Sequence, residues 1–196
     1  MCIRDRSYAV DPQKGAVVMP LTTQGDVPIH YTLDGSEPTA ASPRYTGPVE
    51  IGKSARFRAT ALREGGENAS YSREFAFSKS TGRPAVLNTK PNDSYTFEGA
   101  SLLVDGYHSR PVFTSGAWLG YLDEPLDVTI DMGGEQSYRS VELETLAEKG
   151  DWIFPPSSVT VWVSDNGTDF TEVASVAVPE AKAGDCLLYT SDAADD

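Results

Sequence analysis

Few residues in this chain of 196 have the types and spacing that acid–base or nucleophilic chemistry requires. Asp123 and Glu124 are adjacent carboxylates, but they precede Pro125 in a stretch that predicts a loop. A catalytic carboxylate pair needs a pocket that sets the two pKa values apart, whereas paired acids on a surface are normally solvated. His30 has no metal-ligating or triad partner beside it, so an ordinary strand residue is expected. We therefore expect no catalytic residue and no enzymatic activity in this chain.

Both ends of the chain look like translated DNA of a sequencing adapter. Residues 1–6 fit ATG TGT ATA AGA GAC AG and residues 186–191 fit TGT CTC TTA TAC ACA TCT, which are one DNA sequence read from opposite strands. Both resemble the transposon end used to build sequencing libraries, and residues 192–196 fit the adapter that follows it. Foreign segments are excluded before fold reasoning, so residues 1–6 and 186–196 are set aside. We expect the protein to continue beyond both ends; the alternative is a genuine short N-terminus and an acidic tail.

The two cysteines and part of the charge belong to these ends. Cys2 and Cys186 both lie there, so no disulfide or cysteine metal site is expected. The formal net charge is −13, and it becomes −11 when the two arginines and four aspartates of the ends are left out. This acidic balance argues against nucleic acid and against anionic membranes, which both demand a basic face. No apolar run approaches the roughly 20 residues of a membrane helix, so no membrane insertion is expected.

Strand signals recur along the chain, and helix signals are weak. Residues 55–61, 141–144 and 159–164 alternate small or apolar with polar side chains, as half-buried strands do. Turn signals separate such runs: Asp34-Gly35, Gly65-Gly66, Asp105-Gly106, Gly133-Gly134 and Asn166-Gly167. Proline breaks helix interiors, and 13 prolines are scattered through the chain. We predict an all-β fold of two sandwiches, at residues 7–79 and 82–185.

The first predicted module carries a distinctive string. It runs Ile29-His30-Tyr31-Thr32-Leu33-Asp34-Gly35-Ser36-Glu37-Pro38-Thr39, then Ser42-Pro43-Arg44-Tyr45, Gly47-Pro48-Val49 and the alternating strand 55–61. Asp34-Gly35 supplies a left-handed turn, and Pro38 and Pro43 hold the loop extended. Over nearly the whole module this resembles the small β-sandwich at the C-terminus of chitobiases and β-N-acetylhexosaminidases. The resemblance implies an Ig/fibronectin-like β-sandwich that acts as a spacer or brace.

The second predicted module has its own order of motifs. These are Ser101-Leu102-Leu103-Val104-Asp105-Gly106, Gly116-Ala117-Trp118-Leu119-Gly120-Tyr121, residues 126–133, Trp152-Ile153-Phe154-Pro155-Pro156, residues 158–163, and Ser164-Asp165-Asn166-Gly167-Thr168-Asp169-Phe170. From residue 85 to about 173 this resembles a coagulation factor 5/8 type C (discoidin) domain, whose jelly roll is shared with family 32 carbohydrate-binding modules. Met132 and Asn166 are mild departures, since the family has a leucine and frequently a glycine there. The resemblance implies an incomplete discoidin-like jelly roll, whose last strands are expected to be cut off.

Together the two resemblances imply a parent protein. The order of modules is similar to the C-terminal region of bacterial family 20 glycoside hydrolases, which implies a secreted, periplasmic or cell-surface β-N-acetylhexosaminidase. Its catalytic domain would lie upstream in the same polypeptide. The expected function is a non-catalytic accessory region that binds glycans containing GlcNAc or galactose, or that braces the catalytic domain. The alternatives are a purely structural spacer, or binding modules of an adhesin or of another glycan-active enzyme.

Loop side chains of the second module are the candidates for sugar contacts, because sugar sites combine an apolar wall with few polar groups. They are Tyr107, His108, Arg110, Phe113, Trp118, Tyr121 and Trp152. Trp118 and Trp152 could instead be buried anchors of the sandwich, and Arg110 could simply be solvated.

The resemblance also implies a structural calcium ion beside the Asp-Gly loop. Asp105 would supply a carboxylate and neighbouring backbone carbonyls the rest, since calcium prefers oxygen ligands. The alternative is that Asp105 only caps a turn. No other cofactor is expected.

Overall fold

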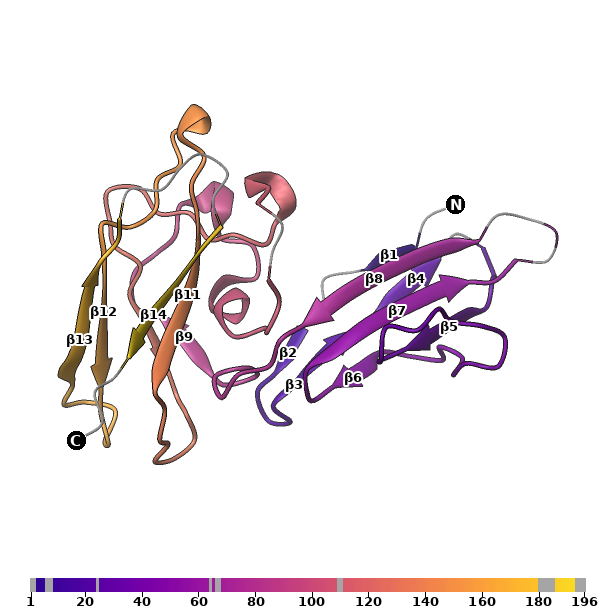
Figure 1. The fold of residues 1–196 in the computed structure, drawn as a ribbon, viewed down its shortest axis with the longest axis horizontal. Helices are drawn as coiled ribbons and strands as arrows, with labels where there is room; N and C mark the ends of the chain where they lie inside the picture. Colours follow the sequence, from indigo (N-terminus) through magenta and orange to yellow (C-terminus); the bar gives the residue numbers. More distant parts are fainter. Residues whose placement is uncertain are drawn as a thin grey trace. The chain divides into compact units, whose positions relative to one another are not determined.

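The computed structural model describes residues 3–5, 9–23, 25–63, 65, 68–108, 111–179 and 186–192. These residues form strands β1 to β14 and four short 3-10 helices (Figure 1). The helices have the following bounds: η1 Asp93–Tyr95, η2 Gly99–Leu103, η3 Phe113–Ser115 and η4 Lys149–Asp151. The predicted all-β fold is confirmed. No helix within the described ranges has the length and apolar character needed to span a bilayer.

The chain divides into two compact units, and each unit is built from two separate stretches of the sequence. The first unit comprises residues 1–86 and 100–108, and the second comprises residues 87–99 and 109–196. Residues 100–108, which the sequence analysis places in the second module, thus belong to the first unit.

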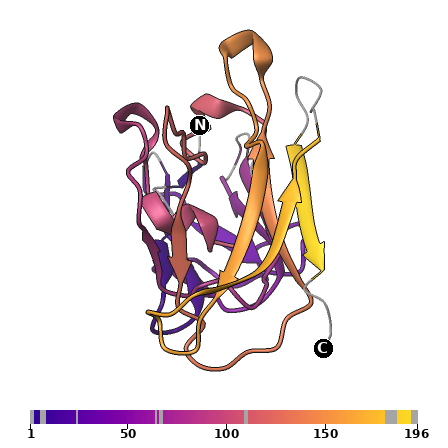
Figure 2. The same ribbon diagram turned by 90° about the vertical axis from the view of Figure 1, so that its left-hand side faces the viewer.

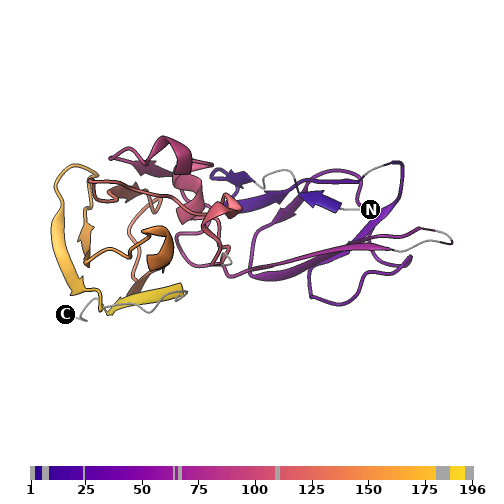
Figure 3. The same cartoon turned by 90° about the horizontal axis from the view of Figure 1, so that it is seen from above.

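The first unit contains a sheet of order β2-β3-β6, a sheet of order β5-β7-β8, and the pair β1-β4. Figure 3 shows β3 and β8 on opposite sides of this unit. The strands have the following bounds: β1 Ile3–Asp5, β2 Ala9–Asp11, β3 Ala16–Met19, β4 Leu21–Thr23, β5 Ile29–Thr32, β6 Val49–Ile51, β7 Ala55–Ala61 and β8 Ala69–Phe75.

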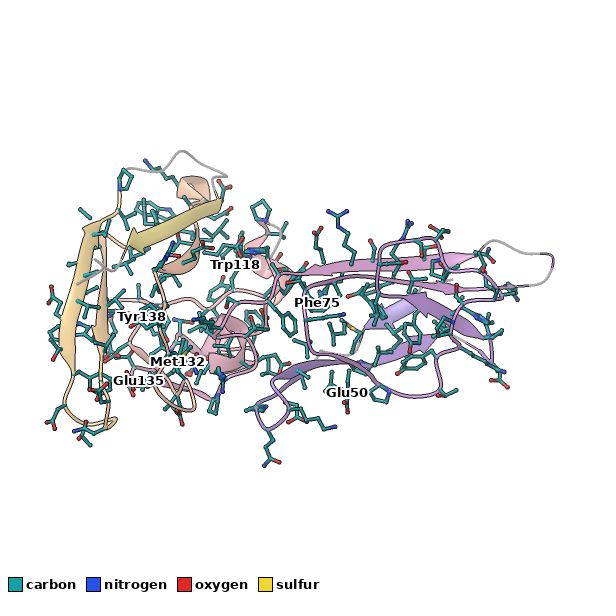
Figure 4. The ribbon with its side chains drawn as sticks, turned by 60° about the horizontal axis from the view of Figure 1, so that its bottom comes forward. Glu50, Phe75, Trp118, Met132, Glu135 and Tyr138 are labelled. Carbon is teal, nitrogen blue, oxygen red and sulfur yellow. The ribbon has the colours of Figure 1, made fainter. Side chains whose placement is uncertain are left out.

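One hydrophobic core joins the two sheets of the first unit. Val17 and Met19 of β3 are fully buried with Phe57 of β7, and Phe75 at the end of β8 is 1% exposed (labelled in Figure 4). The alternation in β7 explains this, because side chains two residues apart share one face of a strand. The Phe57 ring lies 5.9 Å from the Tyr31 ring of β5 and stacks on it. Aromatic packing therefore anchors the first unit at the centre of the core.

The 100–108 segment is fastened to the first unit by backbone hydrogen bonds. Ala76 N–H donates to Gly106 O at 2.7 Å, and Gly82 N–H donates to Val104 O at 2.8 Å. Val104 is 2% exposed. Gly82 has φ 75°, and an added Cβ would lie 2.7 Å from the carbonyl carbon of Gly15. Only glycine fits there without a backbone shift.

The second unit contains the two-stranded pairs β11-β14 and β12-β13 and the strand β10, which pairs with β9. β11-β14 and β12-β13 are antiparallel. The strands have the following bounds: β9 Ala85–Leu87, which leads into the unit, β10 Val128–Ile130, β11 Ser140–Leu146, β12 Ser158–Val163, β13 Thr171–Ala177 and β14 Cys186–Asp192. Among the described side chains of this unit, only Leu146 and Ala147 count as buried apolar residues.

The two strands from the ends, β1 and β14, pair with β4 and β11. Backbone pairing does not distinguish an adapter-encoded segment from a native one. The adapter origin of residues 1–6 and 186–196 therefore stays a prediction.

Candidate binding loops

A closed loop after β11 presents Trp152 to solvent. Glu148 and Ile153 exchange two backbone hydrogen bonds of 3.0 Å, and the helix η4, Lys149–Asp151, fills the loop between them. Trp152 follows η4 with φ 59° and ψ 30°, which is the left-handed conformation. A bulky residue in that conformation is a genuine backbone outlier and costs about 1–2 kcal/mol. The conformation of Trp152 therefore lowers the stability of the loop, and the residue that adopts it carries a large aromatic ring.

The rings of Trp152 and Phe154 form an exposed pair. Trp152 is 82% exposed and Phe154 is 58% exposed. The ring centroids lie 6.5 Å apart in an edge-on arrangement of 76°. The alternative in which Trp152 is a buried anchor does not hold. An exposed aromatic pair on a fixed loop offers an apolar wall to a ligand.

Further exposed apolar side chains stand on neighbouring loops of the second unit. In Figures 1 and 2 the loops that carry η1 (Asp93–Tyr95), η3 (Phe113–Ser115) and η4 lie at the same end of this unit. Phe97 follows η1 with φ 39° and is 47% exposed, and Val112 precedes η3 and is 48% exposed. Several exposed apolar side chains therefore lie on or next to the loops at this end of the unit.

Tyr95 packs between the loops that carry Phe97 and Phe113. The Tyr95 ring lies 6.3 Å from the Phe97 ring and 6.4 Å from the Phe113 ring. Gly120 N–H donates to Tyr95 O at 3.2 Å, and a Cβ at Gly120 would lie 2.9 Å from the Tyr95 Cβ. Phe113 is thus partly buried in a local aromatic cluster.

The other predicted sugar contacts are divided between the two units. Tyr107 and His108 belong to the first unit, and Trp118 and Tyr121 belong to the second with Trp152. His108 is exposed, and Trp118 is partly buried (labelled in Figure 4). Arg110 lies outside the described residues. The structure therefore does not present the predicted residues within a single unit.

Tyr107 and Tyr121 both turn part of their side chain inward. Tyr107 packs against the core of the first unit, and the Arg73 guanidinium carbon lies 4.0 Å from the centre of its ring. The Tyr121 hydroxyl oxygen is buried and accepts or donates no hydrogen bond within the described part of the chain. Burial is the largest cause that raises the pKa of the Tyr121 phenol above its ordinary value of 10.0. Neither residue offers a fully solvent-facing side chain.

Asp105 acts as a turn cap in the first unit. It is 4% exposed, and its Oδ1 accepts a 2.8 Å hydrogen bond from Tyr107 N–H. The flanking carbonyls of Val104 and Gly106 already accept backbone hydrogen bonds. Among the described residues, no group of three or more His, Cys, Asp or Glu side chains could hold a metal ion. The hydrogen bond from Tyr107 N–H fits the turn-capping alternative. The calcium site beside Asp105 stays a prediction.

The carboxylate pair and His30 show no enclosed arrangement. Asp123 has φ 61° and is exposed, as is Glu124. His30 Nδ1 lies 2.7 Å from Ser42 O, which ties the ring to the adjacent loop.

Comparison with known families gives one match. A family model described as Fn3 associated matches residues 19–75, from the end of β3 to the end of β8. No curated protein matches the chain. The family match fits a fibronectin-like module of accessory, non-catalytic character.

Sequence reasoning missed two features of possible binding surfaces. Phe154 was read as part of a motif, although its pairing with Trp152 makes it part of the exposed wall. The first unit also has an open hollow lined by residues such as Tyr31, Leu33 and Arg44, which no sequence pattern predicted. The residues around Arg44 predict an extended loop between turns, and local backbone preferences do not predict a concave surface.

Proposed function

We propose that this chain is a non-catalytic accessory region of a secreted glycoside hydrolase, and that the second unit binds neutral glycans through its η4 loop. The observation that carries the proposal is the exposed Trp152 ring, held in a left-handed backbone conformation beside Phe154. Costly backbone conformations persist where the surrounding structure enforces them, and they cluster at ligand sites.

The chemistry of the loop favours an uncharged sugar. A pyranose presents an apolar face of C–H groups, which the flat indole can cover. Asp151 and Lys149 are exposed next to Trp152 and carry opposite charges, and Glu148 adds a negative charge where the loop begins, so the loop has no positive excess that would select an anion. Glycans that contain GlcNAc or galactose are the ligands that the family resemblance implies.

The proposal of a parent enzyme rests on the family match and on one sequence motif of the first unit. The accessory character of residues 19–75 agrees with a multidomain glycan-active protein. The string from Ile29 to Thr39 points to β-N-acetylhexosaminidases, so we propose that the catalytic domain lies upstream in that polypeptide. Secretion or surface exposure follows from such a substrate.

Retention on immobilised GlcNAc and galactose oligosaccharides tests the binding proposal. Trp152→Ala should weaken retention about tenfold or more, because truncating an exposed aromatic anchor typically removes a large share of binding energy. Trp162→Ala is the matched control: Trp162 lies on β12 and is 53% exposed, but it is not on the η4 loop. Its retention should equal that of the unsubstituted chain.

Two results would contradict the proposal. Equal retention of Trp152→Ala and the unsubstituted chain would exclude the η4 loop as the site. No retention on any glycan would favour the alternative of a purely structural spacer.

A further inference from the structure

The surface of the first unit has an open hollow of about 330 Å³. None of the residues that line it belongs to the η4 loop, which is part of the second unit. Its wall includes the side chains of Tyr31, Leu33, Arg44, Pro48 and Glu50, and Gly47 lies on the same wall. Glu50 is labelled in Figure 4. The volume falls at the lower end of the range for small-ligand sites.

The backbone around the hollow is fixed on both sides. Tyr31 N–H donates to Pro43 O at 3.0 Å and Tyr45 N–H donates to Ile29 O at 2.8 Å, which holds the segment around Arg44 against β5. On the other side, Glu50 belongs to β6, which pairs with β3. The Tyr31 ring is stacked on Phe57 and is therefore held in place. The hollow is a built surface of the sandwich rather than a gap between loose loops.

Arg44 supplies an available positive charge. Arg56 and Arg58 of β7 form ion pairs with Glu74 and Glu37. Arg44 is exposed and forms no ion pair among the described residues, and the Glu50 carboxylate is already paired with Lys14. A guanidinium matches a carboxylate with two parallel hydrogen bonds.

The rest of the wall suits a sugar ring. Tyr31, Leu33 and Pro48 give an apolar side, and Leu33 is 41% exposed. The Glu50 carboxylate and the Thr46 hydroxyl can accept hydrogen bonds from sugar hydroxyls. A ligand that uses all of these groups carries a carboxylate, several hydroxyls and an apolar ring face.

We propose that this hollow binds a hexuronate unit, with its carboxylate on Arg44 and its ring against Tyr31 and Leu33. The proposal concerns other residues than the η4 loop and a charged ligand rather than a neutral one. It therefore stands or fails independently of the function proposed above.

Titration of the full chain with D-glucuronate, followed by NMR of the backbone amides, tests this site. Saturable shifts are expected at the amides of residues 44–47, 49 and 50, with much weaker binding of D-glucose, which lacks the carboxylate, and of acetate, which lacks the ring. Equal affinity for glucose would overturn the role of Arg44. Equal affinity for acetate would overturn the sugar assignment.

Arg44→Gln should weaken glucuronate binding about tenfold or more, because it removes a charge-assisted hydrogen-bonding partner. Arg63→Gln removes the same charge from another exposed position of the first unit and should leave the affinity unchanged. Equal losses in both variants would show that only overall charge matters, and this would overturn the proposal.

A steric pair of variants provides a second test. Gly47 lies on the wall, whereas Gly52 follows β6, and an added Cβ would meet nothing within 4 Å at either position. Gly47→Leu should fill the hollow and abolish the shifts, while Gly52→Leu should bind as the unsubstituted chain does. Undiminished binding by Gly47→Leu would place the ligand elsewhere.

Discussion

The two units use their apolar side chains in opposite ways. In the first unit, residues such as Met19, Phe57 and Phe75 are buried between two sheets. In the second unit, the described buried apolar residues are Leu146 and Ala147, while Trp152, Phe154 and Trp162 are more than half exposed. Burial of apolar area is the main stabilising contribution to folding. The comparison teaches that the first unit is held together by aromatic side chains inside its core, whereas the second unit leaves several of its largest aromatic side chains on its surface.

The strongest way to break this comparison is to truncate one aromatic ring in each unit. Phe57→Ala should lower the free energy of unfolding by about 3–5 kcal/mol, because it leaves a cavity in a closed core. Phe154→Ala should change it by about 0.5 kcal/mol or less, as exposed substitutions do. Urea unfolding followed by far-ultraviolet circular dichroism measures both. Similar costs for the two variants would refute the contrast between the units.

A glycine substitution tests how tightly the first unit closes on residues 100–108. Gly82→Ala should cost about 2 kcal/mol or more, because it strains a left-handed residue and brings Cβ against the Gly15 backbone. Gly52→Ala is the control, since its Cβ would meet nothing within 4 Å and no left-handed φ is involved. Thermal unfolding of both variants measures the difference. A Gly82→Ala chain as stable as the control would show that this junction is loose.

Trp152→Asn separates stability from binding in the second unit. Asparagine tolerates the left-handed conformation far better than tryptophan, so the free energy of unfolding should rise by about 0.5–1 kcal/mol. Glycan retention should fall at the same time, because the indole is gone. Unfolding and retention are measured on the same sample. A loss of stability would show that Trp152 supports the fold instead of a ligand.

The smallest expected effect is a pH response in the turn after β5. Hydrogen bonds from the Ser36 hydroxyl and from its backbone N–H hold the pKa of Asp34 below its ordinary value of 3.8. A lowered pKa adds stability above the ordinary value that is lost as the pH falls through the folded pKa. Ser36→Ala should move the pKa of Asp34 up toward 3.8 and reduce the loss of stability on acidification. Carbon-13 NMR titration of the carboxyl measures this, and an unchanged pKa would contradict the assignment.

Local patterns predicted the parts of the fold that depend on nearby residues. The alternation of residues 55–61 predicted β7, and the Asp34-Gly35 pair predicted the turn after β5, where Gly35 has φ 83°. Both signals come from a few adjacent residues and their backbone preferences.

Contacts between distant residues were harder to predict. Residues 100–108 join the first unit through bonds to Ala76 and Gly82, and no periodicity in the sequence encodes those partners. The exposure of Trp152 was left open for the same reason, because composition cannot tell a buried anchor from an exposed one. The Arg44 hollow is lined by residues of both β5 and β6, and no pattern in the residues between these strands predicts that both would line one surface.

The assignment of residues 100–108 to the first unit has a consequence for how these modules can be exchanged. The chain passes from one unit to the other three times, after residues 86, 99 and 108. A gene segment that ended near residue 86 would encode the first unit without Val104 and without the hydrogen-bond acceptors of Ala76 and Gly82. A gene segment that encodes all of the first unit must therefore extend to residue 108, and it carries residues 87–99 of the second unit with it.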